Sequence, residues 1–213
     1  GALMSRQQPT RRTPMFSAGP EDFEAVWRTF SGAQRTLGAT PGARDEWHRG
    51  RARYAVWIFR VDGAEVLARL GRAREALAPW IDPMPDREAH ITVAVAGFPA
   101  AAPVFDDDIA EERLENALSE LRADPPPAPA LEIGGLTSFL SCPVLEVYDP
   151  AAGLAALRAR LGQYHPEVRF TPYLPHVTAG LYAGQPAAPI AEAIAPLRAL
   201  PRLTMRPSAL ELV

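Results

Sequence analysis

Two stretches of this chain share one order of elements, strand then helix then strand, and both end in the triplet His-x-Thr. Hydrophobic periodicity predicts the six elements at 54–61, 63–78 and 90–96, and again at 143–148, 151–163 and 174–182. The interval from Tyr54 to His90 is 36 residues, and the interval from Pro143 to His176 is 33 residues. A repeat of this size predicts that the chain folds as two similar halves.

Capping and proline signals predict further elements around the two units. Pro20, followed by two acidic residues, opens a helix of about four turns that ends at Gly38. Asp108 and Glu111 have the spacing of a capping box for a helix that ends before Pro125. The remaining predictions are a strand at 130–135, a helix at 189–197 and a single strand at 203–212.

Composition favours a soluble globular protein. The 213 residues, 47% of them hydrophobic, supply enough apolar material for one domain or for two small lobes with a common core. No apolar run reaches the length of about 18 residues that a membrane span requires, and residues 1–20 lack the apolar stretch of a signal peptide. The single cysteine, Cys142, has no partner for an internal disulfide. We therefore expect a cytoplasmic protein with no membrane partner.

The chain divides into three predicted parts. Residues 1–20, rich in proline, arginine and glutamine, are predicted to be a disordered tail. Residues 21–52 form an N-terminal helical extension with its connector, and residues 53–213 form the main, bilobal domain. The amphipathic helix of the extension fits three roles, as a lid, as a dimer contact or as a cover for a sheet edge. These alternatives and the oligomeric state stay open.

Charge narrows the range of partners. The net charge of -3 argues against a surface that binds long nucleic acid without sequence preference, because such binding needs many phosphate-neutralising side chains. All 22 basic residues are arginine, so no lysine can serve as a nucleophile or as a P-loop residue. A small or terminal phosphate remains compatible with this composition.

The two His-x-Thr triplets carry the chemistry. In a strand, residues i and i+2 face the same side, so His90 projects with Thr92 and His176 projects with Thr178. If the halves pack symmetrically, two imidazoles and two hydroxyls converge across one cleft. Imidazoles with a pKa of about 6.5 can serve as general base and general acid, and the hydroxyls can bind phosphate oxygens. Chance would produce about 0.2 such triplets from four histidines and ten threonines, which favours a functional pair over two ordinary strand motifs.

The segments HITV, which begins at His90, and PHVT, which ends at Thr178, resemble the paired H-x-T-x signatures of the two-histidine (2H) phosphoesterase superfamily. This superfamily includes RNA 2′,3′-cyclic phosphodiesterases, once called 2′-5′ RNA ligases. The resemblance covers residues 53–213 and implies an α+β, bilobal fold with two antiparallel sheets flanking a central cleft, pseudo-twofold symmetry and helices on the outside. It also implies cleavage of a cyclic (2′,3′) or 2′,5′ phosphodiester of a nucleotide or RNA end, with no metal and no cofactor.

The resemblance further implies roles by position. His90 and His176 would be the general acid and general base, with His176 as the base in our preferred assignment. Thr92 and Thr178 would bind the phosphate. Phe139 occupies a place where the family often has an aromatic side chain that stacks on a base, so it is a predicted substrate-binding residue.

Departures from the family pattern concern the substrate. The N-terminal extension is not part of the minimal pattern, and Tyr173 and Leu174 stand where basic residues are frequent. An RNA end would need positive charge near the cleft, for which Arg53 and Arg169 are available. The alternatives are a small cyclic nucleotide, a 2′,5′-linked oligoadenylate or a phosphorylated metabolite. A further alternative is not an enzyme. It is a non-catalytic module that has the same fold and binds nucleotide or RNA.

For the remaining notable residues the sequence indicates structural roles or a secondary role in substrate binding. Tyr182 shares a face with His176 by alternation, so we include it as a predicted substrate-binding residue, although core packing explains it equally well. His48 and His165 fit solvated or capping roles. The acidic run at 106–108 precedes a helix, where capping explains it better than a metal site does.

Overall fold

The computed structural model describes residues 19–167 and 172–213, so the predicted disordered tail lies outside the described residues except for its last two. The strands are β1 (Ala55–Arg60), β2 (His90–Ala100), β3 (Asp108–Ala110), β4 (Leu131–Ser138), β5 (Pro143–Tyr148), β6 (His176–Thr178), β7 (Leu203–Met205) and β8 (Leu210–Leu212). The helices are α1 (Pro20–Ser31), α2 (Ala43–His48), α3 (Ala64–Leu77), α4 (Glu111–Ala123), α5 (Gly153–Leu161), α6 (Ala188–Ile194) and the 3-10 helix η1 (Ala195–Leu197). None of the helices in these two ranges is long and apolar enough to span a bilayer.

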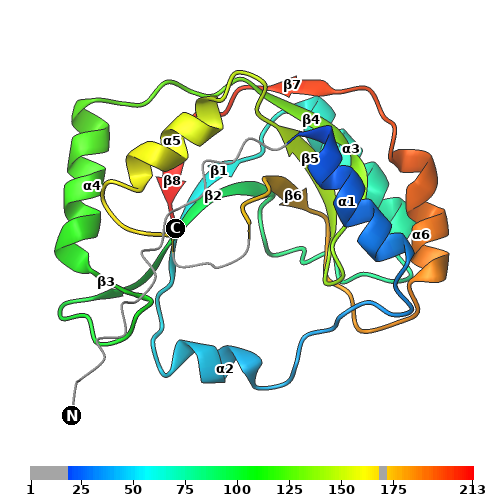
Figure 1. Cartoon of the computed structure of the whole chain (residues 1–213), viewed down its shortest axis with the longest axis horizontal. Helices are drawn as coiled ribbons and strands as arrows, with labels where there is room; N and C mark the ends of the chain where they lie inside the picture. The colour runs from blue at the N-terminus through cyan, green and yellow to red at the C-terminus, as the bar shows by residue number, and fades with distance from the viewer. Residues whose placement is uncertain (1–18, 168–171) are drawn as a thin grey trace, which may run out of the picture.

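All eight strands belong to one sheet. Seven strands follow the order β7-β4-β5-β6-β2-β1-β8 with antiparallel neighbours, and β3 pairs in parallel with the end of β2. The two predicted sheets are joined edge to edge where Ile91 of β2 pairs with Val177 of β6. The sheet curls about this junction (Figure 1), and the predicted α+β architecture with an antiparallel sheet and outer helices is confirmed.

The crossover helix of each unit packs on the other half of the sheet. Helix α3 connects β1 to β2, yet it lies beside α6 behind β4 and β5 (Figure 1). Arg69 of α3 donates to the carbonyls of Ile133 and Gly134 at 3.1 and 3.0 Å, and Arg74 donates to the carbonyl of Ala179 at 3.0 Å. Helix α5 connects β5 to β6 and packs against β2. One continuous apolar core therefore runs through both halves.

The elements with the strongest sequence pattern form where they were predicted. Helix α3 lies within one residue of its predicted ends, and its buried side chains recur at helical spacing, so one apolar face meets the sheet. These side chains are Val66, Leu70, Ala73 and Leu77. Strand β5 has its predicted bounds, and all six of its residues are buried because helices cover both faces of this part of the sheet.

Three predicted boundaries are wrong. The single strand expected at 203–212 is two short strands at opposite edges of the sheet, β7 beside β4 and β8 beside β1. Pro207 lies between them, and proline has no N–H for a strand ladder. The strand expected at 174–182 is limited to three residues, because the chain then turns away and Leu181 pairs with Asp82. The first helix ends at Ser31 rather than near Gly38.

The capping box predicted at Asp108 is also wrong. Asp108 lies in β3, and its carboxylate accepts hydrogen bonds from the backbone N–H groups at 104–105. Arg51 pairs with Asp108 at 2.7 Å and with Asp107 at 2.6 Å. The guanidinium of Arg51 also lies 3.6 Å from the ring centroid of Phe98. The acidic run therefore fixes the connector that follows α2.

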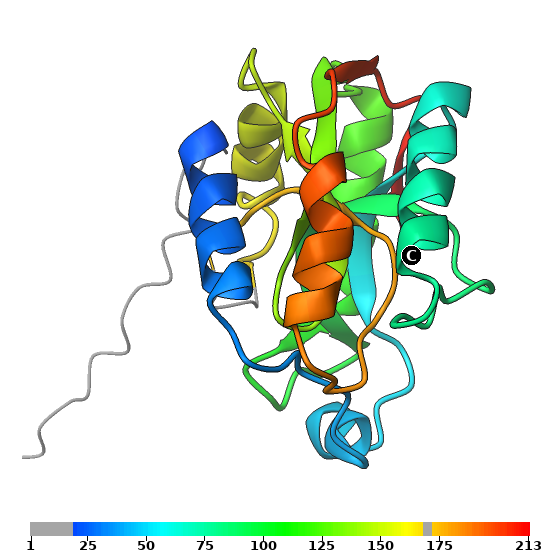
Figure 2. The same ribbon diagram turned by 90° about the vertical axis from the view of Figure 1, so that its right-hand side faces the viewer.

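Helix α1 is an integral layer of the second half. It packs against β4 and α6, and its Phe23 and Phe30 are 1% and 0% exposed. Figure 2 shows α1 and α3 on opposite sides of this half of the molecule, with α6 between them. The N-terminal extension thus covers a face of the sheet rather than its edge.

Candidate active site

The pairing of β2 with β6 places the two motifs side by side. Their central residues, Ile91 and Val177, are opposite each other in an antiparallel pair and are fully buried. The flanking positions are then opposite one another in the pairs His90 with Thr178 and Thr92 with His176. These four side chains are half-buried and project from the other face of the sheet. Because opposite residues have Cβ atoms about 5 Å apart, each hydroxyl lies next to the imidazole of the other motif.

Both imidazoles are held by the same hydrogen bond. Nδ1 of His90 lies 3.0 Å from the carbonyl oxygen of Glu88, and Nδ1 of His176 lies 2.7 Å from the carbonyl oxygen of Leu174. A carbonyl only accepts, so Nδ1 of each ring carries the hydrogen. Nε2 is then the nitrogen that gains or loses a proton, which gives both rings the tautomer that an acid–base pair requires.

The electrostatic surroundings of His90 favour its neutral form. Burial lowers the pKa of His90, and the positive charges of Arg87 and Arg60 lower it further. A neutral imidazole at neutral pH is suited to remove a proton from water. This environment favours His90 as the base, which is the reverse of the assignment that we preferred from the sequence.

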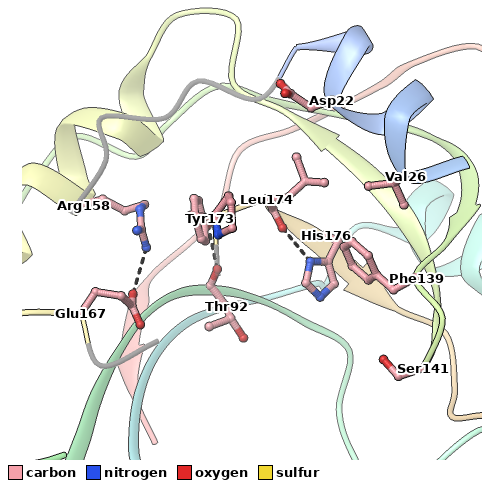
Figure 3. A pocket seen from close by; sticks show the side chains of 11 residues that line it. Asp22, Val26, Thr92, Phe139, Ser141, Arg158, Glu167, Tyr173, Leu174 and His176 are labelled. Atoms are coloured by element: carbon pink, nitrogen blue, oxygen red, sulfur yellow. Dashed lines mark hydrogen bonds and ion pairs between the residues drawn. The ribbon is translucent and has the colours of Figure 1, made fainter. Parts of the chain in front are cut away.

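A cavity of about 520 Å³ opens beside His176 (Figure 3). It is lined by Asp22, Val26, Thr92, Phe139, Ser141, Arg158, Glu167, Pro172, Tyr173, Leu174 and His176. His90 and Thr178 lie at the next register positions but do not belong to this lining. Phe139 meets the edge of His176, with ring centroids 5.0 Å apart and an interplanar angle of 77°. One residue predicted to bind substrate, Phe139, therefore lies at the cavity.

Side chains replace a missing strand next to Thr92. Because β6 has three residues, its pairing with β2 ends near Thr92, and the following residues of β2 pair with β1 on their other side. The Tyr173 hydroxyl donates to the carbonyl of Thr92 at 2.8 Å, and Arg158 donates to the carbonyl of the next residue at 2.5 Å. The carboxylate of Glu167 accepts from the N–H of Val95 at 3.1 Å. This network holds the backbone that carries the first motif.

The buried cation of this network is paired. Arg158 is 5% exposed, lies 3.1 Å from Glu167 and stacks on Tyr173 at 3.6 Å from the ring centroid. The pair adds no net charge to the cavity. Of the two arginines considered for an RNA end, Arg53 pairs with Glu111 at 2.6 Å outside the cavity lining, and Arg169 lies outside the described residues.

Tyr182 is a core residue rather than a cavity residue. It is 4% exposed, its hydroxyl lies 2.7 Å from the Ser138 hydroxyl, and its ring stacks on Phe30 at 5.9 Å. The alternation that placed Tyr182 beside His176 fails because β6 ends at Thr178. The prediction that Tyr182 contacts substrate is therefore wrong.

The two remaining histidines lie away from the cavity. His165 is 3% exposed, and its Nε2 accepts a hydrogen bond of 2.8 Å from the indole N–H of Trp57, so a solvated role is wrong for it. Burial lowers the pKa of His165. His48 lies in α2 with its Nδ1 3.0 Å from the carbonyl of Arg51. No group of three or more His, Cys, Asp or Glu side chains in 19–167 and 172–213 could hold a metal ion.

Eight of the eleven cavity residues received no site role from the sequence. They are Asp22, Val26, Ser141, Arg158, Glu167, Pro172, Tyr173 and Leu174. Arg158 did carry a signal, because it lies four residues after Leu154 and three before Leu161, on the apolar stripe of α5. An arginine on an apolar stripe indicates a buried, paired cation. Asp22 carried none, since an acidic residue in the first turn of a helix is common.

A curled antiparallel sheet that presents two His-x-Thr strands side by side defines a phosphoesterase of the two-histidine class. The family model of the 2′-5′ RNA ligase superfamily matches residues 59–213, and the chain belongs to this superfamily of 2H phosphoesterases. Among solved structures, the chain is similar to the crystal structure of the MHV ns2 PDE domain, with 13% sequence identity, a TM-score of 0.47, and coverage of 76% of this chain and 98% of that chain. No curated protein matches the chain.

Proposed function

We propose that this chain hydrolyses a cyclic (2′,3′) or 2′,5′ phosphodiester of a nucleotide or an RNA end, without metal or cofactor. The observation that supports this proposal is the matched orientation of His90 and His176. Each ring donates from Nδ1 to the carbonyl two residues earlier, and each lies opposite a threonine of the other motif. Two imidazoles with fixed tautomers and two hydroxyls on one face suit a phosphodiester, which needs a base, an acid and donors to its free oxygens.

For a 2′,3′-cyclic substrate the proposed reaction is an in-line attack of water on phosphorus. Neutral His90 takes a proton from the water at Nε2 while the new P–O bond forms. The bond from phosphorus to O3′ breaks, and protonated His176 gives its proton to O3′, which leaves a 2′-phosphate. The hydroxyls of Thr92 and Thr178 donate to the non-bridging oxygens, whose charge grows in the transition state. The lowered pKa of His90 supports its role as the base.

Hydrolysis assays in EDTA test this proposal. The panel comprises the four 2′,3′-cyclic nucleotides, an oligoribonucleotide with a cyclic end and 2′,5′-linked oligoadenylate. The variants are His90→Ala, His176→Ala and the double variant, and His48→Ala is the matched control because His48 lies outside the site. We expect each single active-site variant to lose about 10²- to 10⁴-fold in kcat, which is the usual contribution of a general acid or base.

The outcomes separate the proposal from its alternative. Turnover in EDTA that depends on both His90 and His176, with His48→Ala at the wild-type rate, supports the proposed hydrolase. Full activity of either single variant would contradict the acid–base pair. Tight binding of one ligand without turnover would support the non-catalytic binding module instead.

A further inference from the structure

Helix α1 forms a fixed wall of the cavity. Phe23 packs edge-on against Tyr148 of β5, with ring centroids 5.3 Å apart and an interplanar angle of 69°. Trp27 lies under Arg198, whose guanidinium carbon is 4.5 Å from the ring centroid, and Arg198 pairs with Glu146 at 3.3 Å. Glu146 is the direct neighbour of His176 across the β5–β6 pair. The helix is therefore anchored to the same face of the sheet that carries the second motif.

The side of α1 that lines the cavity carries one polar and one apolar side chain. Asp22 and Val26 lie one helical turn apart, on the same side of α1, and both line the cavity. Figure 3 shows Val26 near Phe139, and Asp22 farther out beyond Leu174. Val26, Phe139 and Leu174 supply apolar surface, as the flat faces of a nucleobase require. A cavity of about 520 Å³ lies within the range of small-ligand sites.

Asp22 presents a hydrogen-bond acceptor to this space. Its Oδ2 accepts the backbone N–H of Gly19 at 2.9 Å, which fixes the orientation of the carboxylate. Within residues 19–167 and 172–213, no other side chain or backbone group bonds to this carboxylate. A carboxylate accepts hydrogen bonds and does not donate them.

An acceptor at this position distinguishes nucleobases by their edges. Adenine, cytosine and guanine each carry an exocyclic amino group, which donates hydrogen bonds. Uracil carries carbonyl oxygens on both sides of its single N–H, and these oxygens repel a carboxylate. Cytosine and uracil have the same size and differ at two neighbouring positions, because the amino group and bare N3 of cytosine are a carbonyl and an N–H in uracil. A carboxylate placed beside the exocyclic group therefore accepts a hydrogen bond from cytosine and meets a carbonyl oxygen in uracil.

We infer that α1 completes a nucleobase subsite with Phe139, and that Asp22 selects bases with an exocyclic amino group over uracil. This inference rests on the proposed function, since it identifies the nucleotide that the site takes. It also assigns a role to the N-terminal extension, which lies outside the residues that match the family model. Asp22 and Val26 are specificity-determining residues in this arrangement.

The test compares cytidine with uridine 2′,3′-cyclic phosphate. For the wild-type chain we expect kcat/KM to favour the cytidine substrate about tenfold, which corresponds to about 1.4 kcal/mol. Asp22→Asn keeps an oxygen for Gly19 and adds an amide donor that uracil can accept, so the preference should fall to about twofold or less. Glu21→Gln is the matched control, because it removes one charge from the same turn at an exposed position outside the cavity. It should leave the preference unchanged.

Binding measured by calorimetry separates the inference from the proposed function. The ligands are cytidine and uridine 2′-monophosphate, whose affinities do not depend on turnover. Turnover with equal rates on the two pyrimidines would overturn the base subsite and leave the hydrolase standing. Absence of turnover together with a cytidine preference in Kd that Asp22→Asn removes would overturn the hydrolase and support the subsite. Absence of both turnover and pyrimidine binding would overturn both.

Discussion

His90 and His176 are related by a matched hydrogen bond, in which Nδ1 of each ring donates to the carbonyl of the residue two positions earlier. The two rings differ in their surroundings. His90 is close enough to Arg87 and Arg60 for their charges to lower its pKa, whereas His176 meets the edge of Phe139. Two rings of the same tautomer in different surroundings can divide the roles of base and acid between them.

The first prediction concerns the pH dependence of kcat/KM. If His90 is the base, its protonation ends activity, so the acidic limb should fall below the ordinary histidine pKa of about 6.5. Arg87→Gln removes a positive charge that opposes protonation, so the pKa of His90 should rise and the limb should move to higher pH. Arg72→Gln, an exposed change on α3, is the control. An acidic limb that stays in place in Arg87→Gln would show that His90 is not the group observed.

The second prediction concerns stability and pH. Burial lowers the pKa of both His165 and His90, so the unfolded chain binds more protons than the folded chain as pH falls through about 6.5. The free energy of unfolding should therefore be lower at about pH 5 than at about pH 7. His165→Gln should make this drop smaller, and the further change His90→Gln should make it smaller still. Denaturant titrations at the two pH values measure the drop, and a drop of unchanged size in the double variant would refute the explanation.

The third prediction concerns the buried ion pair beside Thr92. Arg158→Met removes the buried cation that lies 3.1 Å from the carboxylate of Glu167, whose side chain is 10% exposed, and should cost about 3–5 kcal/mol of unfolding free energy. Arg158→Met with Glu167→Gln should recover part of this loss. Arg160→Met is the control on the same helix, where the more exposed pair with Asp124 should be worth about 1 kcal/mol or less. Equal losses in the two arginine variants would argue against a special role for Arg158.

The fourth prediction concerns a close backbone approach in β4. A Cβ at Gly135 would lie 1.9 Å from the carbonyl oxygen of Arg198, so Gly135→Ala must displace the backbone at 197–198. We expect a loss of about 3 kcal/mol or more, at the large end for single substitutions. Gly71→Ala is the matched control, because a Cβ at this position in α3 meets no atom within 4 Å. It should stabilise the protein by about 0.5–1 kcal/mol, since alanine favours helix over glycine. Thermal unfolding of both variants measures the contrast, and a Gly135→Ala protein as stable as wild type would contradict the close approach.

Local pattern was sufficient for some elements and insufficient for others. Helix α3 and strand β5 were predicted within a residue because their burial follows from their own periodicity. The stretch 203–212 was predicted as one strand, because its apolar residues do not reveal that its ends pair with different partners, β4 and β1. Strand pairing is a long-range property, so sequence spacing alone could not place β7 and β8.

Some residues of the site could likewise be predicted from local pattern, whereas others depend on long-range packing. The His-x-Thr triplets could be predicted from spacing, since alternation within each strand fixes their common face. Phe139 was predicted from the family resemblance and lies at the cavity. Asp22 and Val26 reach the cavity only because α1 docks on β4 and contacts Tyr148 of β5, which joins segments more than 100 residues apart in the chain. Tyr182 was misplaced because alternation was extended beyond the end of β6.

The exchange of crossover helices between the halves has a thermodynamic consequence. Helix α3 leaves its own strands to pack behind β4 and β5, and α5 leaves its own strands to pack against β2. Each half of the sheet is thus covered by the crossover helix of the other half. Unfolding of one half therefore also exposes the apolar core of the other half. The described chain should melt in a single cooperative transition, in which calorimetric and van't Hoff enthalpies agree.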